Sequence, residues 1–292
     1  MLVWRLLLGA VFIGGITALC WADYHAKLPG IWLLPLAVLL AILASGELLT
    51  MMSAKGFQPA SIEVYLGNLA IVAANWLGYV APKTLKDDSF QAPAITFILA
   101  VLVVFVVEMV RYREPGQSTV RLATAIFALS YVGWLITFLI KLRFLGGTHT
   151  GMAALAALIV VVKMCDIGAY TVGRLVGRHK MTPRLSGGKT FEGLAGGLVF
   201  ACCGSWFAFH WLLPKMGDPL PQAPPAYAWL VFGLVVGTAG VLGDLAESLI
   251  KRDLGCKDSS TWMPGFGGVL DVLDSLLFAS PVAYLTWRWL VA

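Results

Sequence analysis

Long apolar runs alternate with short polar segments along the whole chain. A helix needs about 20 apolar residues to cross the hydrocarbon core of a bilayer. Candidate spans are residues 5–22, 29–46, 62–81, 92–111, 121–141, 150–172, 191–213, 226–247 and 265–291. Several of these runs are short or interrupted, so eight or ten spans also fit the pattern. The pattern predicts an all-α, polytopic integral membrane protein with about nine transmembrane helices.

The composition supports a membrane protein and argues against a soluble fold. Of the 292 residues, 59% are hydrophobic and 13% are charged, and the mean hydropathy is +0.82. Soluble domains carry about 25% charged residues. The net charge of +5 suits anionic lipid headgroups but is too small and too scattered for nucleic-acid binding. The five cysteines form no CxxC pair, which favours small apolar residues over a disulfide or zinc framework.

Lysines and arginines indicate the orientation of the spans, because cytoplasmic loops carry an excess of both. If the N-terminus is cytoplasmic, thirteen of the 21 basic residues lie in cytoplasmic segments and seven in outside segments. We therefore expect a cytoplasmic N-terminus. The first run resembles a secretory signal, but the next span follows at once, so we expect an uncleaved first helix. Lys163 lies inside an apolar run, where snorkelling toward the cytoplasmic interface is a sufficient explanation.

Polar residues divide the chain into two predicted regions. Residues 1–120 form an N-terminal membrane region of about four spans with few polar groups. Glu47 and Glu108 are exceptions, and we interpret both as satisfied interfacial carboxylates. Residues 121–292 form a catalytic membrane region of about five spans, in which the candidate chemistry is concentrated. The cytoplasmic loops of this region are residues 174–190 and 248–266.

The first charge-rich segment, residues 165–197, combines small residues with basic ones. Asp166 lies where an apolar run gives way to small residues, and the glycines around the segment recur four residues apart, which is typical of close helix packing in membranes. Between these glycines lies Ser186-Gly187-Gly188-Lys189-Thr190, beside Arg178, His179, Lys180 and Arg184. Two glycines before Lys-Thr let backbone N–H groups approach an anion, and a helix starts directly afterwards. We predict a phosphate-binding loop that lacks P-loop spacing, with His179 as a solvated loop residue.

The second charge-rich segment, residues 243–275, is the most ion-dense part of the chain. On a helix, Asp244, Glu247, Ser248 and Lys251 share one face. Asp271, Asp274 and Ser275 share a face at the start of the last span. Two helices that each present carboxylates at the cytoplasmic end can converge on Mg²⁺, which prefers a few carboxylates completed by phosphate oxygens and water. Structural ion pairs are the alternative, and Asp253 and Asp258 fit it as well as they fit a function.

These two segments carry a resemblance to a known family. The chain has Asp166-x-Gly168-Ala169-Tyr170, then Ser186-x-Gly188-Lys189-Thr190-x-Glu192-Gly193, then Ser248-x-x-Lys251-Arg252-x4-Lys257-Asp258, and finally Gly267-Gly268-x-Leu270-Asp271-x-x-Asp274. This long pattern resembles that of the phosphatidate cytidylyltransferases (CDP-diacylglycerol synthases). The agreement covers residues 165–275 and is weak before them.

The resemblance implies a fold, a reaction and site residues. It implies a polytopic all-helical enzyme in the bacterial inner membrane, a homodimer, with its active site open to the cytoplasm. The reaction would join CTP and phosphatidate into CDP-diacylglycerol and pyrophosphate, with Mg²⁺ and with room for a second cation. The implied catalytic residues are Asp244, Lys251, Asp271 and Asp274, with Asp244 and Asp274 as metal ligands. The implied substrate-binding residues are Ser186, Gly188, Lys189, Thr190, Glu192, Arg252, Lys257 and Asp258.

Two positions depart from the family's pattern. Phe266 stands where the family has histidine, and Val272 stands where it has arginine. A potential proton carrier and a permanent cation are therefore missing, while the carboxylates and Lys189 remain. This leaves two alternatives open, a related CTP-dependent transferase that acts on another lipid phosphate and a catalytically impaired membrane scaffold of the same fold. A transporter is disfavoured because the chain shows no paired, interrupted spans in two matching halves.

Overall fold

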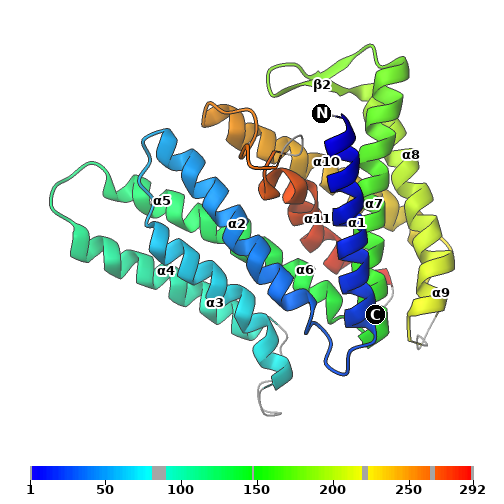
Figure 1. Cartoon of the computed structure of the whole chain (residues 1–292), viewed down its shortest axis with the longest axis horizontal. Coiled ribbons are helices and arrows are strands. Elements are labelled where there is room, and N and C mark those ends of the chain that lie inside the picture. The colour runs from blue at the N-terminus through cyan, green and yellow to red at the C-terminus, as the bar shows by residue number, and fades with distance from the viewer. Residues whose placement is uncertain (1, 81–89, 147, 219–222, 264–266, 291–292) are drawn as a thin grey trace. The chain divides into compact units, whose positions relative to one another are not determined.

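The computed structural model describes residues 2–80, 90–146, 148–218, 223–263 and 267–290 (Figure 1). The chain divides into two compact units. The first comprises Met1–Ile140 together with Asp253–Val272, and the second comprises Lys141–Arg252 together with Leu273–Ala292. The predicted division at residue 120 was drawn from polar residues rather than from contacts, and it stays a prediction.

The first unit is built from helices near the N-terminus. They are α1 (Leu2–Tyr24), α2 (Leu33–Ala54), α3 (Ser61–Val80), α4 (Gln91–Arg111), α5 (Ser118–Ala128), the π-helical turn η2 (Leu129–Trp134) and the start of α6 (Leu135–Arg143). Polar side chains join these apolar helices. Asn68 of α3 donates a hydrogen bond of 2.8 Å to Ser45 of α2. Glu108 is 4% exposed and lies 2.6 Å from the Arg121 guanidinium, which confirms it as a satisfied carboxylate.

The second unit holds most of the predicted chemistry. Its elements are α7 (Thr148–Val176), β1 (Lys180–Thr182), β2 (Ser186–Thr190), α8 (Phe191–Phe207), the π-helical turn η3 (Ala208–Leu212), α9 (Leu213–Met216), α10 (Ala228–Asp253) and most of α11 (Val269–Leu290). Figure 1 shows α7 and α8 side by side, with the two strands forming a hairpin at one end of the pair. Helix α11 begins in the first unit and continues into the second.

Small residues allow α7 and α8 to pack backbone against backbone. A Cβ atom at Gly197 would lie 3.0 Å from the carbonyl oxygen of Cys165. One at Gly168 would lie 2.6 Å from the Cβ of Phe200 and 2.9 Å from the carbonyl oxygen of Gly196. Real Cβ atoms do not approach neighbours this closely, so only glycine fits at Gly168. The predicted role of Gly193 and Gly197 in close helix packing is confirmed, because a Cβ atom at Gly193 would also lie 2.8 Å from the carbonyl oxygen of Ala169.

A larger side chain at Gly168 is expected to separate α7 from α8. We expect Gly168→Leu to lower the melting temperature in detergent by roughly 5 °C or more, since overpacking of a close interface is destabilising by about 1–3 kcal/mol or more. Gly15→Leu is the control, because nothing lies within 4 Å of a Cβ at Gly15 of α1. Equal melting temperatures for the two variants would contradict the packing argument.

Seven helices are long and apolar enough to cross a membrane. They are Leu33–Ala54, Gln91–Arg111, Ser118–Arg143, His149–Val176, Phe191–Met216, Ala228–Asp253 and Val269–Leu290. Each coincides with a predicted span, and the structure confirms an all-α, polytopic membrane protein. The two other predicted spans fall on α1 and α3, which contain side chains outside the described residues. The number nine therefore stays a prediction.

Candidate active site

Three helices of the second unit meet at a small residue of α10. A Cβ atom at Gly240 would lie 3.5 Å from Val162 of α7 and 3.9 Å from the Cβ of Ser275 of α11. One turn later, a Cβ atom at Gly243 would lie 2.7 Å from the carbonyl oxygen of Asp274. Gly243 therefore lets α11 approach α10 closely, whereas α7 meets Gly240 at ordinary van der Waals distance.

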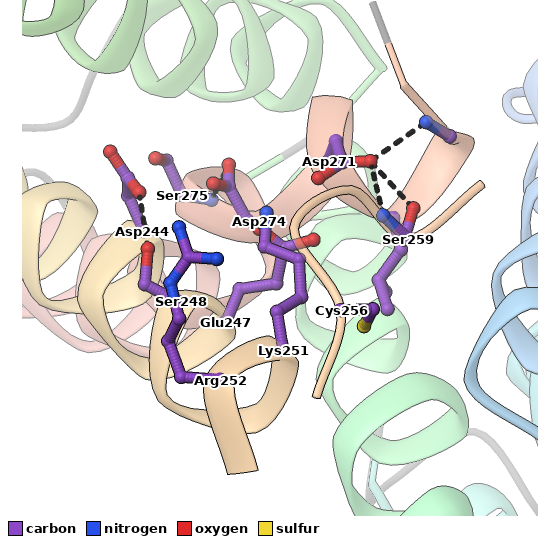
Figure 2. Close-up of polar contacts among 12 residues, drawn as sticks. Asp244, Glu247, Ser248, Lys251, Arg252, Cys256, Ser259, Asp271, Asp274 and Ser275 are labelled. Carbon is purple, nitrogen blue, oxygen red and sulfur yellow. Dashed lines mark hydrogen bonds and ion pairs between the residues drawn. The ribbon is translucent and has the colours of Figure 1, made fainter. Parts of the chain in front are cut away.

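Each of the three helices contributes an aspartate at this point. Asp166 follows Val162 by one turn, Asp244 follows Gly240 by one turn, and Asp274 directly precedes Ser275. The three carboxylates are close enough to interact electrostatically with one another. Figure 2 shows Asp244 and Asp274 projecting from neighbouring stretches of α10 and α11. We call Asp166, Asp244 and Asp274 the carboxylate cluster. Sequence reasoning noted Asp166 as part of a motif but did not select it as a site residue.

Two lysines lie beside the carboxylate cluster. The Lys189 ammonium lies 2.8 Å from Oδ2 of Asp244. Its nitrogen is buried, and within the described residues its contact with Asp244 is an ion pair without hydrogen-bond geometry. The Lys163 ammonium lies 3.1 Å from Oδ2 of Asp166 and also interacts electrostatically with Asp274. Sequence reasoning assigned Lys163 only to snorkelling.

Asp274 is the most deeply buried member of the carboxylate cluster. It is 8% exposed, and its carboxylate accepts a hydrogen bond from the backbone N–H of Ser275. Within the described part of the chain, no lysine, arginine or histidine lies at ion-pair distance from it. A buried carboxylate in a transmembrane helix is unfavourable unless a cation balances it. The site therefore has the electrostatic character of a cation site.

The donor set of the carboxylate cluster fits Mg²⁺ only with help from a ligand. No group of three or more acidic, histidine or cysteine side chains among the described residues is arranged to hold a metal by itself. Mg²⁺ usually binds one or two protein carboxylates and completes its shell with water and substrate phosphate. Asp244 and Asp274 supply hard oxygen donors of that kind. The residues present therefore fit a magnesium ion that arrives together with phosphate.

The segment predicted to bind phosphate forms the second strand of a hairpin, and its binding of phosphate stays a prediction. Strand β1 pairs antiparallel with β2, with Lys180 opposite Thr190 and Thr182 opposite Ser186. The pairing holds the two ends of the Gly-rich segment against β1, while Gly187 and Gly188 between them are exposed. Side chains alternate along a strand, so Lys189 is directed to Asp244 while Thr190 caps α8 by accepting the N–H of Gly193 at 3.1 Å.

Glu192 fastens the hairpin to the end of α7. Its carboxylate accepts the backbone N–H of Arg178 at 3.1 Å and that of His179 at 3.2 Å, and it lies 2.5 Å from Nδ1 of His179. His179 is exposed, as predicted, but its ring has this partner. Gly188 is exposed and Ser186 half-buried. Roles of these hairpin residues in substrate binding stay predictions.

The basic residues at the end of α10 have protein partners. The Lys251 ammonium lies 2.6 Å from Oε2 of Glu247, one turn earlier on the same face, and both side chains are buried. Arg252 donates from Nε to the carbonyl oxygen of Leu185 at 3.3 Å, which joins α10 to the hairpin turn. The predicted shared face of α10 is present. Whether Lys251 and Arg252 bind substrate stays a prediction.

A second acidic network lies in the first unit and is centred on Glu47. The Glu47 side chain is 7% exposed and accepts the backbone N–H groups of Val269 and Leu270, each at 2.8 Å. It also accepts the indole N–H of Trp262 at 2.8 Å and lies 2.9 Å from the Ser259 hydroxyl. Glu47 of α2 therefore caps the N-terminus of α11. Its interpretation as a satisfied carboxylate is confirmed.

Asp271 belongs to this second network. Its Oδ2 atom accepts the backbone N–H groups of Ser259 at 2.9 Å and Gly268 at 2.7 Å, and it lies 2.7 Å from the Ser259 hydroxyl, as Figure 2 shows. A Cβ atom at Gly268 would collide with Glu47 and Ser259, which explains the need for glycine there. Through these hydrogen bonds Asp271 holds the loop before α11 against the start of that helix. Its catalytic role stays a prediction.

For the remaining predicted residues the structure gives few contacts that bear on function. Lys257 and Asp258 are exposed, and no ion pair involves either of them within the described ranges. Val272 is half-buried in α11. Phe266 lies outside the described residues. Nothing here tests the predicted substrate contacts of Lys257 and Asp258.

Comparison with known proteins places the whole chain in one group. A sequence model described as the cytidylyltransferase family matches residues 3–290. A phosphatidate cytidylyltransferase of Bacillus subtilis is 30% identical over 261 residues, which cover 86% of this chain and 88% of that protein. One from Staphylococcus saprophyticus is 32% identical over 258 residues, covering 87% and 88%. The uncharacterized protein YnbB of Escherichia coli is 36% identical over 164 residues, covering 56% and 50%.

Proposed function

The chain belongs to the cytidylyltransferase family, and from this we propose that it transfers the cytidylyl group of CTP to phosphatidate. The products would be CDP-diacylglycerol, an intermediate of phospholipid biosynthesis, and pyrophosphate. The observation that carries the proposal is the carboxylate cluster with Lys189 buried beside Asp244. The two relatives that extend over most of the chain and are named phosphatidate cytidylyltransferase support it.

We propose Mg²⁺ as the cofactor, held by Asp244 and Asp274. When bound, the ion would neutralise charge on the nucleotide phosphates and on the pyrophosphate leaving group. Asp166 lies within electrostatic reach of both ligands and would supply oxygen donors to a second cation. The buried Lys189 ammonium, with protons free of hydrogen bonds to the described residues, would bind a phosphate oxygen of CTP.

The reaction needs positioning more than proton transfer. A phosphate monoester has a second pKa of about 6, so phosphatidate carries a nucleophilic oxygen near neutral pH. That oxygen would form a bond to the α-phosphorus of CTP while the bond to the bridging oxygen of the β-phosphate breaks. Pyrophosphate leaves with the electron pair of that bond. Because no proton must be removed from the attacking group, the reaction tolerates Phe266 in place of a histidine.

The location and assembly of the enzyme follow the same proposal. The chain is an integral membrane protein. We propose that it resides in a bacterial inner membrane as a homodimer, with the N-terminus and the carboxylate cluster facing the cytoplasm, where CTP is found. The excess of lysine and arginine in the predicted cytoplasmic segments supports this orientation.

A panel of lipid phosphates tests the acceptor. Purified protein would be incubated with Mg²⁺, CTP labelled at the α-phosphate, and either phosphatidate, an isoprenoid ether-lipid phosphate or a polyprenyl phosphate. We expect label in the lipid fraction with phosphatidate at a rate at least about tenfold above the other two acceptors, the discrimination that roughly 1.4 kcal/mol of differential binding gives. Preferential labelling of another acceptor would instead assign the chain to a related transferase. Label in no lipid would favour a catalytically impaired scaffold. That alternative is kept because Val272 removes a cation that the resemblance implies at this position.

A further inference from the structure

We propose that Lys163 of α7 is a substrate-binding residue that contacts the phosphate of the lipid acceptor. The inference rests on the proposed function and assigns to one residue the recognition of one of its two substrates. Lys189 would contact the nucleotide phosphates, and Lys163 would contact the phosphate that enters from the bilayer.

Lys163 is held beside the carboxylate cluster by the packing of its neighbour. Val162 is fully buried and lies against Gly240, at the point where α7, α10 and α11 meet. The Lys163 ammonium lies 3.1 Å from Oδ2 of Asp166 and acts electrostatically on Asp274. The side chains of Lys163 and Asp166 are 43% and 41% exposed. The ammonium is therefore near the reacting groups and open to a ligand.

The position of Lys163 along α7 argues against a simple interfacial anchor. Lys163 lies 13 residues before Val176, the last residue of α7. The other end of α7 is as distant. With α7 centred in a hydrocarbon core about 30 Å thick, a residue near its midpoint lies roughly 15 Å from either interface, which is beyond the reach of a four-carbon side chain. A charged residue near the middle of a span that turns to an acidic partner is typical of a functional site.

The direction of α7 assigns Lys163 to the lipid rather than to the nucleotide. The end of α7 leads to the hairpin that carries Lys189, and Asp166 lies between that end and Lys163. Lys189 therefore reaches the carboxylate cluster from the hairpin side, whereas Lys163 reaches it from farther inside the span. We infer that the lipid phosphate approaches from this side, because its acyl chains stay in the bilayer whereas CTP comes from the aqueous phase.

The charge balance of the site supports a second cation at this place. The three carboxylates, the Lys189 ammonium and the proposed Mg²⁺ together carry a net charge of about zero, so they leave no surplus positive charge to attract a doubly charged phosphate monoester. Lys163 supplies a second positive charge from α7. An incoming phosphate would compete with Asp166 for the Lys163 ammonium.

Kinetics with Lys163→Met separate lipid recognition from nucleotide recognition. In mixed micelles we expect KM for phosphatidate to rise roughly ten- to hundredfold, the range expected for loss of one charge-assisted hydrogen bond. KM for CTP should stay within about twofold, a change of less than RT in binding free energy, because the substitution leaves the nucleotide contacts in place. Lys163→Arg, which retains the charge, should restore most of the affinity for phosphatidate. Lys55→Met is the matched control, since Lys55 is exposed at the end of α2 and no described ion pair involves it.

A double variant separates substrate binding from simple neutralisation of Asp166. If Lys163 only balanced Asp166, Lys163→Met with Asp166→Asn would regain the wild-type KM for phosphatidate, and the proposal would be wrong. An unchanged KM in Lys163→Met would also overturn it. A wild-type protein without transfer activity would contradict the proposed function instead. In that case equilibrium binding of a short-chain phosphatidate decides, and weaker binding by Lys163→Met than by Lys55→Met supports the proposal.

Discussion

Asp244→Asn is expected to reduce cytidylyl transfer by roughly a thousandfold or more, comparable with the removal of a principal electrostatic contact in an active site. The change removes a hard anionic donor for Mg²⁺ and the partner that lies 2.8 Å from the Lys189 ammonium. Asparagine has nearly the same shape as aspartate, and the Asp244 side chain is 37% exposed. We therefore expect the folded protein to persist with a melting temperature close to that of the wild type.

Asp253→Asn provides the matched control for this loss. Asp253 is the last residue of the same helix, is exposed, and has no described ion pair. Its replacement should leave turnover unchanged. The rates of both variants would be measured with labelled CTP and phosphatidate, and their melting temperatures would be compared in the same detergent. Equal turnover in the two variants would show that Asp244 takes no part in the reaction.

Glu47→Ala is expected to produce the largest loss of stability among single substitutions in the first unit. Glu47 accepts hydrogen bonds from the N-terminus of α11 and from Trp262, and alanine would leave these donors without an acceptor. The N–H groups of Val269 and Leu270 are buried, and each buried donor left unpaired is destabilising by about 1–3 kcal/mol. We expect a total loss of roughly 3–5 kcal/mol and a decrease in melting temperature of about 5–15 °C.

The consequences of Glu47→Ala should extend to activity, because the capped helix α11 carries Asp274 five residues after Val269. Glu114→Ala is the control, since Glu114 is exposed in the connection between α4 and α5 and forms no ion pair with a described residue. Thermal unfolding in detergent and turnover at a temperature below both transitions would be measured. A Glu47→Ala protein as stable as Glu114→Ala would contradict the capping role.

The membrane helices were predictable from the sequence because the length of an apolar run is a local property. Seven predicted spans coincide with helices of sufficient length and hydropathy. The hairpin was not predicted, because Ser186 to Thr190 contains two glycines and has little intrinsic strand preference. Its pairing with Lys180 and Thr182 depends on the positions of α7 and α8, which the local pattern does not contain.

The site was predictable where charge was concentrated and unpredictable where it depended on packing. Asp244, Asp274 and Lys189 stood out as charges in apolar or small-residue surroundings. Asp166 and Lys163 belong to the same site because α7 packs against α10 at Gly240, which also faces Ser275 of α11. The spacing of residues within one segment cannot predict which helices pack against each other.

Glu47 shows the same limit over a longer separation. Its partners Trp262, Val269 and Leu270 follow it by more than two hundred residues along the chain. The sequence showed an acidic residue at the end of an apolar run, and the interpretation as a satisfied carboxylate was correct. The partners and the capping of α11 required the folded structure.

The balanced formation of two products tests the central claim most directly. Purified full-length protein would be supplied with phosphatidate, α-labelled CTP and Mg²⁺, and CDP-diacylglycerol and pyrophosphate would be counted together. The account predicts equal amounts of both products, with no product above background after chelation of Mg²⁺ or in Asp244→Asn. If the wild-type protein with Mg²⁺ formed no more of either product than Asp244→Asn does, the proposed function would be contradicted.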